Sequence, residues 1–192
     1  MIYKIFATAI ALCFFLAGCK KGEEPPQKEE FSCVKLTDEL GQSFGISGCS
    51  TSNDGGNTTL STAEAAYFTG NDTSFLQGTV SVPITEVPQY PNPVMAGTSF
   101  RIQILSPSPG NLIKLQLAII DESKNILFQY AGNVDSNASL SIAVPTDKFS
   151  KGSYYRVYYR VSALGAPIIF EGHSNFLICK QIGPLNIDTD CL

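Results

Sequence analysis

The chain has 192 residues, which is enough for one ordinary domain and a tether but not for two large domains. The composition is 44% hydrophobic and 16% charged, which excludes a disordered acidic tail. Thirteen Lys and Arg residues against seventeen Asp and Glu residues give a net charge of -4. No excess of positive charge is available to neutralise phosphates, so we expect no nucleic-acid partner.

Residues 1–18 have the pattern of a secretory signal. Lys4 supplies a positive charge, and residues 5–17 form an apolar stretch that only Thr8 interrupts. A membrane-spanning helix needs about 20 apolar residues, and Lys20 and Lys21 close this stretch earlier. The pattern therefore favours a cleaved signal over a permanent membrane span.

The apolar stretch ends in Leu16-Ala17-Gly18-Cys19. This run resembles the lipobox of bacterial lipoproteins, in which small residues precede a cysteine that becomes the attachment point for lipid. The resemblance implies cleavage before Cys19, a diacylglycerol thioether on its sulfur and acylation of the new amino group. Two or three acyl chains hold a protein stably on a membrane. The alternative is an ordinary signal peptide in which the cysteine is incidental.

Residues 19–30 contain the expected lipidated Cys19 and then a charged, proline-containing run that is typical of a flexible, solvated tether. Within it, Lys21-Gly22-Glu23-Glu24 is similar to the signal that sends many Bacteroidota lipoproteins to the outer face of the outer membrane. A plain hydrophilic spacer explains the same residues equally well. The expected location is thus the cell envelope, at the outer membrane, on its periplasmic or its outer face.

Residues 31–89 are expected to form a small β extension or hairpin that packs on the main domain. Strand character is found at 31–37 and 77–85, and residues 61–67 favour a single helical turn. Residues 41–60 lack a hydrophobic period and read as loop. Within this loop, residues 53–57 are oxygen-rich but hold one carboxylate, so we expect no calcium or other metal site.

The remaining residues, 90–192, show alternating apolar and polar positions in short runs separated by turn residues, and no long helical period. Seven such strands are expected, at 99–105, 112–120, 125–130, 138–144, 154–162, 167–170 and 175–179. Short strands with a turn about every ten residues are typical of a Greek-key sandwich. The predicted fold is therefore all-β, an immunoglobulin-like antiparallel β-sandwich with a small N-terminal β extension.

A second resemblance supports this fold. The run Tyr90-Pro91-Asn92-Pro93-Val94, the Asp121 turn and the strand opened by Lys151-Gly152-Ser153-Tyr154 occur in the order found in immunoglobulin-like modules of Bacteroidota secreted proteins. The family they resemble most is the C-terminal sorting domain of the type IX secretion system. The resemblance implies the fold and not the sorting role, because the chain continues for about thirty residues past the last of these motifs.

Once the signal is removed, four cysteines remain besides Cys19: Cys33, Cys49, Cys179 and Cys191. Four cysteines allow three pairings, and local pairing, Cys33 with Cys49 and Cys179 with Cys191, is the simplest. A disulfide that closes a loop of this length stabilises the fold by about 3 kcal/mol in the chain-entropy model. Their spacing does not fit zinc, so structural disulfides in an oxidising compartment are predicted.

The sequence contains few candidate catalytic residues. His173, the single histidine, lies in a predicted turn at 171–174, and Asp188 and Asp190 lie in a terminal segment. None of the recognised catalytic motifs surrounds them, so we expect no enzymatic activity and no cofactor. A hydrolase that uses His173 as its base is kept as a minor alternative.

One strand suggests a binding surface. In residues 154–161, alternation places Tyr154, Arg156, Tyr158 and Arg160 on the face opposite the predicted core. Two phenols and two guanidinium groups can stack on sugar rings or hold carboxylates. Cross-strand pairing on a solvated sheet explains the same stripe without any ligand.

The sequence thus favours a lipid-anchored, non-enzymatic binding or structural module, with the membrane as one partner and a glycan or an envelope protein as the other. The alternative is an accessory lipoprotein subunit of an export or surface-assembly machine, to which the sandwich adds an edge strand.

Overall fold

The computed structural model describes residues 31–49, 55–69, 82–163 and 168–179, and residues Phe31–Leu192 form one compact unit. The predicted signal, the predicted lipobox with Cys19 and the predicted tether lie outside the described residues, as do Cys191, Asp188 and Asp190. No helix within the described ranges is long and apolar enough to cross a membrane.

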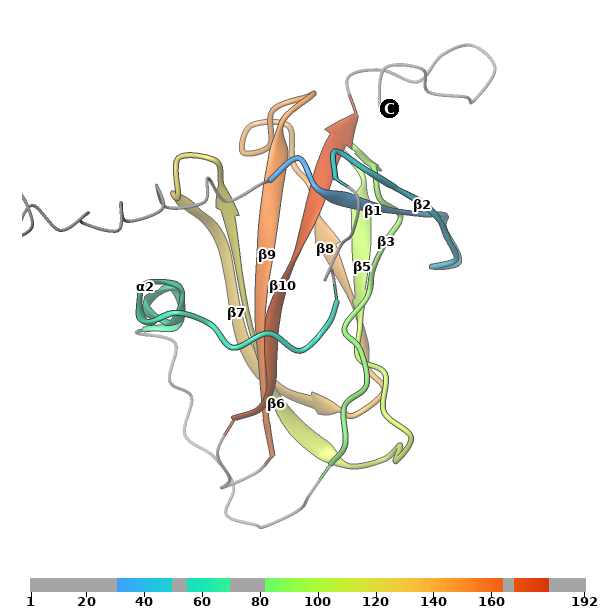
Figure 1. Cartoon of the computed structure of the whole chain (residues 1–192), viewed down its shortest axis with the longest axis vertical. Coiled ribbons are helices and arrows are strands. Elements are labelled where there is room, and N and C mark those ends of the chain that lie inside the picture. Colours follow the sequence, from blue (N-terminus) through green and yellow to red (C-terminus); the bar gives the residue numbers. More distant parts are fainter. Residues whose placement is uncertain (1–30, 50–54, 70–81, 164–167, 180–192) are drawn as a thin grey trace, which may run out of the picture. The chain divides into compact units, whose positions relative to one another are not determined.

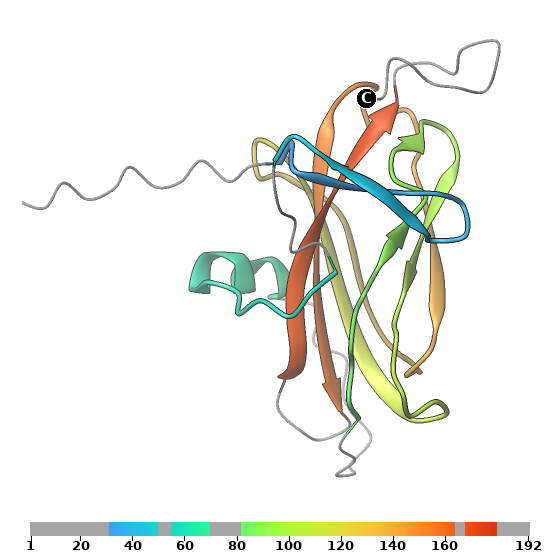
Figure 2. The same ribbon diagram turned by 45° about the vertical axis from the view of Figure 1, so that its right-hand side comes forward.

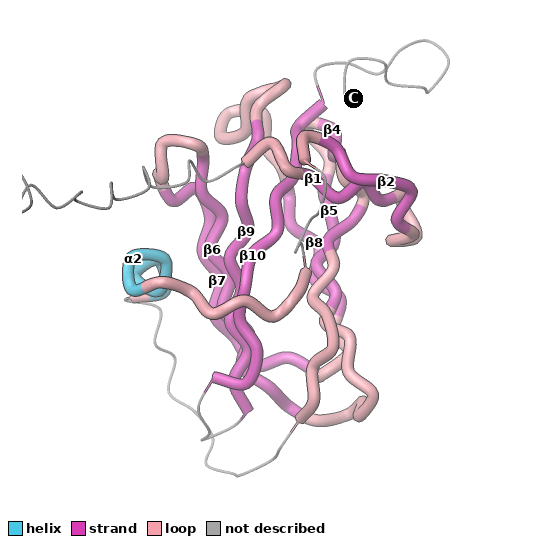
Figure 3. The backbone as a smooth tube through the Cα atoms, in the orientation of Figure 1, coloured by secondary structure: helices cyan, strands magenta, loops and turns pink. Residues whose placement is uncertain are grey.

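Two β-sheets face each other across the core (Figure 1). The five-stranded sheet has the order β4 (Val94–Met95), β10 (Ile168–Cys179), β9 (Tyr154–Ala163), β6 (Leu112–Asp121) and β7 (Ile126–Asp135). The three-stranded sheet has the order β3 (Gln89–Tyr90), β5 (Ser99–Gln103) and β8 (Ser139–Ala143). Strands dominate the tube view of the chain (Figure 3). The predicted all-β sandwich is confirmed.

The core lies where alternation predicts it. On β5, Phe100 and Ile102 are buried while Arg101 between them is exposed. The Phe100 ring contacts Phe176 of the opposite sheet, with 4.7 Å between ring centroids. Burial of one such side chain stabilises the fold by roughly 1.5–3 kcal/mol. These cross-sheet contacts are what hold the two layers together.

A tyrosine fixes the entry into β9. The backbone N–H of Ser150 donates a hydrogen bond of 2.6 Å to the Tyr155 hydroxyl, while the Tyr155 ring packs between Phe149 and Phe176. A tyrosine at the start of this strand that bonds back to the preceding corner is a hallmark of immunoglobulin-like folds. The local geometry therefore agrees with the predicted fold family.

β10 corrects one prediction. Residues 167–170 and 175–179 were expected as two strands with a turn at 171–174, but β10 is one strand of 12 residues that pairs along β9. The glycine that suggested a turn, Gly172, instead allows a close approach. A Cβ atom there would lie 2.4 Å from the Gly56 carbonyl oxygen and 2.6 Å from the Tyr159 hydroxyl.

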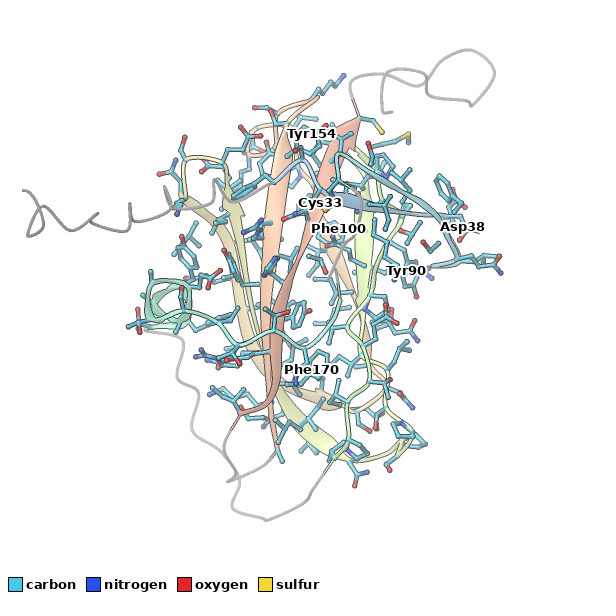
Figure 4. The ribbon with its side chains drawn as sticks, viewed as in Figure 1. Cys33, Asp38, Tyr90, Phe100, Tyr154 and Phe170 are labelled. Carbon is cyan, nitrogen blue, oxygen red and sulfur yellow. A yellow bond between two sulfur atoms is a disulfide. The ribbon has the colours of Figure 1, made fainter. Side chains whose placement is uncertain are left out.

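The N-terminal extension is confirmed as a hairpin of β1 (Val34–Thr37) and β2 (Ser43–Ser47). Figure 4 shows Asp38 at its turn and Cys33 toward its other end. Backbone hydrogen bonds between Thr37 and Asn92, 2.8 and 3.1 Å long, join it to the sandwich. β2 lies in the region expected to be loop, because two apolar residues around a glycine give too short a pattern to recognise.

Residues 55–69 are here called the cover segment. They begin beside Val87, pass Glu171 of β10 and continue over the outer face of the five-stranded sheet (Figure 2). They contain α2 (Thr62–Ala65) and the 3-10 helix η1 (Ala66–Phe68), which confirms the predicted helical turn. Ser61 and Glu64 form a capping box at its start. Of the strand expected at 77–85, only 82–85 are described, and they are not in a strand.

Candidate functional site

The binding surface suggested by the sequence is a stripe of four side chains on β9. Alternation is confirmed: Tyr155, Val157, Tyr159 and Val161 lie in the main core, and Tyr154, Arg156, Tyr158 and Arg160 lie on the opposite face. The expected exposure of that face is wrong. Tyr158 is 0% exposed and Arg156 4%, because Phe31 and the cover segment lie over them.

The covered face forms a second apolar cluster. Phe31, Leu60 and Phe68 come from the N-terminal region, and they pack on Ala118, Ile120 and Tyr158 of the sheet. Tyr67 contacts the Tyr158 ring, with centroids 5.2 Å apart. No local sequence pattern predicted this cover, because the apolar residues involved are single and far apart in the chain.

Arg156 lies under Phe31. Its guanidinium carbon is 4.5 Å from the centroid of the Phe31 ring, and its Nε donates a hydrogen bond of 2.7 Å to Asn175 Oδ1. A desolvated cation over an aromatic face is stabilised by about 2 kcal/mol. The arginine is thus engaged by the protein itself, whereas the sequence left open that it binds an external ligand.

Arg160 is engaged in the same way by the other end of the cover. Its guanidinium carbon is 4.7 Å from the centroid of the Phe68 ring, and its Nε lies 3.1 Å from Glu171 Oε2. The second oxygen of Glu171 accepts a hydrogen bond of 3.1 Å from the Leu60 backbone. One carboxylate therefore ties the stripe to the cover segment.

Between these two arginines, Tyr158, His173 and Glu64 meet. The rings of Tyr158 and His173 lie 5.7 Å apart. Burial, and then the positive charge of Arg156, lower the pKa of His173 from 6.5 to about 4, against a smaller opposing effect of Glu64. Burial tends to raise the pKa of Glu64, but hydrogen bonds from Ser61 and Tyr158 lower it overall. At neutral pH the imidazole is therefore uncharged and a weak base.

His173 was expected in a turn, and it lies instead within β10. Its neighbours are the Tyr158 ring and the charges of Arg156 and Glu64. A general base works best with a pKa near the operating pH, which is not the case here. The arrangement suits a packed interface between sheet and cover.

A buried amide network, which the sequence did not predict, joins the hairpin to both sheets. Asn92, 1% exposed, donates hydrogen bonds of 2.9 Å to the carbonyls of Lys35 and Asn175 and accepts one from the Leu177 backbone. Gln89 also donates to the Asn175 carbonyl, at 2.6 Å. The Tyr-Pro-Asn-Pro run therefore serves as a connector, and Asn92 is its central group.

A pocket of about 10 Å³ lies beside this network, between Thr37, Gly55 and Ser174. A space of that size admits about one water molecule and no larger ligand. Within the described ranges no group of three or more His, Cys, Asp or Glu side chains is placed to hold a metal ion. Asn57, from the oxygen-rich loop, accepts a hydrogen bond from the Glu171 backbone.

The disulfide between Cys33 and Cys49 is confirmed, and it closes the base of the hairpin. Cys179 at the end of β10 is also disulfide-bonded, while Cys191, its expected partner, lies outside the described residues. The hairpin carries three of the large apolar side chains that are exposed in the described part of the chain: Leu40, Phe44 and Ile46.

No protein-family model matches the chain, and no curated protein matches it. Among solved structures, it is similar to a glycosyl hydrolase family 2 member from Bacteroides cellulosilyticus DSM 14838, with 15% identity and a TM-score of 0.29 over 50% of this chain. A second structure of a family 2 member from Bacteroides cellulosilyticus gives 16% identity and a TM-score of 0.30 over 50%. The match spans 14% and 13% of those two chains, so their activity as whole proteins does not transfer.

Proposed function

We propose that the protein is a lipid-anchored, non-enzymatic module of the cell envelope, in which a tether holds an immunoglobulin-like domain next to the membrane. The observation that carries the proposal is Leu16-Ala17-Gly18-Cys19, directly after an apolar signal stretch. The compact unit begins at Phe31, so eleven residues separate Cys19 from it. At about 3.3–3.6 Å per extended residue, they allow a separation of no more than about 40 Å.

Two features of the domain support a location outside the cytoplasm. The Cys33–Cys49 disulfide closes the hairpin, and Cys179 is bonded as well. Disulfides persist in oxidising compartments and are rare in the cytosol. They agree with export of the chain by the signal that precedes Cys19.

A binding or structural role is supported by how the domain uses its reactive groups. Arg160 and Glu171 hold the cover segment, Arg156 packs under Phe31, and His173 is kept neutral on the same covered face. A glycan or an envelope protein would therefore bind elsewhere on the domain, at a surface that the cover leaves open.

The test is growth of producing cells on radiolabelled palmitate, followed by separation of membrane and soluble fractions. Wild-type protein should carry label and sediment with membranes, and Cys19→Ser should lose both properties. Cys13→Ser is the matched control, because it changes a cysteine of the signal stretch and leaves the lipobox intact. Unlabelled wild-type protein in the soluble fraction would refute the anchor.

A further inference from the structure

The two lateral edges of the sandwich differ in how far other segments of the chain cover them. β3 and β4 are joined through residues 91–93 and stand at one side of the two sheets, so β7 and β8 stand at the other. The β3 and β4 side is covered: Thr37 of β1 bonds to Asn92, Gly55 accepts from Val87, and Thr58 donates to Glu171. The cover segment also reaches β7, where the Gln129 side chain donates a hydrogen bond of 2.7 Å to the Tyr67 carbonyl, but this contact uses no backbone group of β7.

β7 therefore has a free backbone edge. It pairs with β6 on one side, and the described residues form no backbone hydrogen bond with residues 126–134 on its other side. Unpaired N–H and C=O groups in a row are a template for a further strand. Natural proteins usually block such an edge with lysine, proline, bulges or a covering loop.

The usual protection is nearly absent from this edge. Residues 126–134, Ile-Leu-Phe-Gln-Tyr-Ala-Gly-Asn-Val, contain no charged residue and no proline. A register shift opposite Ile119 and Ile120 disturbs the pairing near Leu127, and the pairing is regular from Phe128 to Asp135. A regular, uncharged edge of this length is long enough to pair with another strand.

The side chains of β7 suit an added strand as well. Phe128, Tyr130 and Val134 pack against the main core but are only partly buried. Tyr130 also folds over Gly132: a Cβ atom at Gly132 would lie 2.5 Å from the Tyr130 hydroxyl. An added strand would cover the apolar surface that the sandwich leaves in contact with water.

We propose that β7 pairs antiparallel with β7 of a second copy of this chain, so that two five-stranded sheets become one continuous sheet. A strand without charges meets no like-charge repulsion when it pairs with itself. Two-fold pairing uses the same patch on both copies and closes after two.

The test is sedimentation equilibrium of the full-length chain, extracted in a non-ionic detergent matched in density to the solvent. Wild-type protein should have the mass of two copies. Ala131→Lys places a lysine in the middle of the edge, on the sheet face opposite the core, and should halve that mass. Ser123→Lys adds the same charge in the exposed turn before β7 and should keep two copies.

A second variant keeps the result from depending on one lysine. Ala131→Glu should also halve the mass, and an equal mixture of the Lys and Glu variants should restore two copies, since opposite charges then lie near each other across the pair. The proposal is overturned if wild-type protein has the mass of one copy at every concentration, or if Ala131→Lys leaves two copies. A single-copy mass with slow amide exchange along β7 would assign the edge to a segment of the same chain and overturn it too.

Discussion

The cover segment should contribute measurably to the stability of the domain, and Phe68→Ala tests this most cleanly. Phe68 is 5% exposed, ends η1 and packs over the Arg160 guanidinium. Replacement by alanine removes that ring and leaves the arginine with less cover. The predicted effect is a lower free energy of unfolding and a cover segment that opens more often.

The magnitude follows from the environment of the ring. Phe→Ala changes in a core cost about 3–5 kcal/mol, and the lower end applies here because the cover can settle into part of the space. The cation–π contact with Arg160 accounts for about 1–2 kcal/mol of this. For a unit of this size, a loss of about 3 kcal/mol lowers the melting temperature by about 6–12 °C.

The assay is urea unfolding followed by circular dichroism, with limited proteolysis of the cover segment alongside. Phe44→Ala is the matched control, since Phe44 is 62% exposed and should cost less than about 0.5 kcal/mol. Equal stability of the two variants, with no new cleavage in residues 55–69, would show that the cover does not hold the sheet face as described.

Three further predictions concern single groups. Tyr159→Phe leaves the Gly56 carbonyl without its donor and should lower the free energy of unfolding by about 1–3 kcal/mol in urea titrations; an unchanged midpoint would contradict that hydrogen bond. His173 has a folded-state pKa of about 4 against 6.5 for the free group, so the free energy of unfolding should fall as the pH drops from 6.5 toward 4. An NMR titration of its ring with a midpoint near 6.5 would refute this. Joint replacement of Cys33 and Cys49 by serine opens a loop with a sequence separation of 16 and should cost about 3 kcal/mol by calorimetry; no loss would mean that the hairpin is held by its contacts with the sandwich alone.

Patterns local to a strand were predictable from the sequence. Period-two alternation assigned Phe100 and Ile102 to the core and separated Tyr155 from Arg156 on β9. The helical turn predicted at residues 61–67 was also found, and in the structure it begins at a capping box of Ser61 and Glu64. Each of these signals is contained in a few neighbouring residues.

The predictions that failed concerned contacts between residues that are far apart in the chain. Alternation gives the face of a strand and not what covers it, so Tyr158 was expected in solvent while Tyr67 and Phe31 close over that face. Gly172 was read as a turn residue, although its lack of a side chain makes room for Gly56. Contacts across about one hundred residues leave no period in a sequence.

Lipid anchoring depends on the state of Cys19, and intact-mass spectrometry of the protein purified from membranes measures that state directly. A lipid-anchored protein should give a chain that begins at Cys19 and carries the added mass of a diacylglycerol and, where amino acylation follows, of a further fatty acid. A chain that begins elsewhere, or that begins at Cys19 with an unmodified thiol, would contradict lipid anchoring.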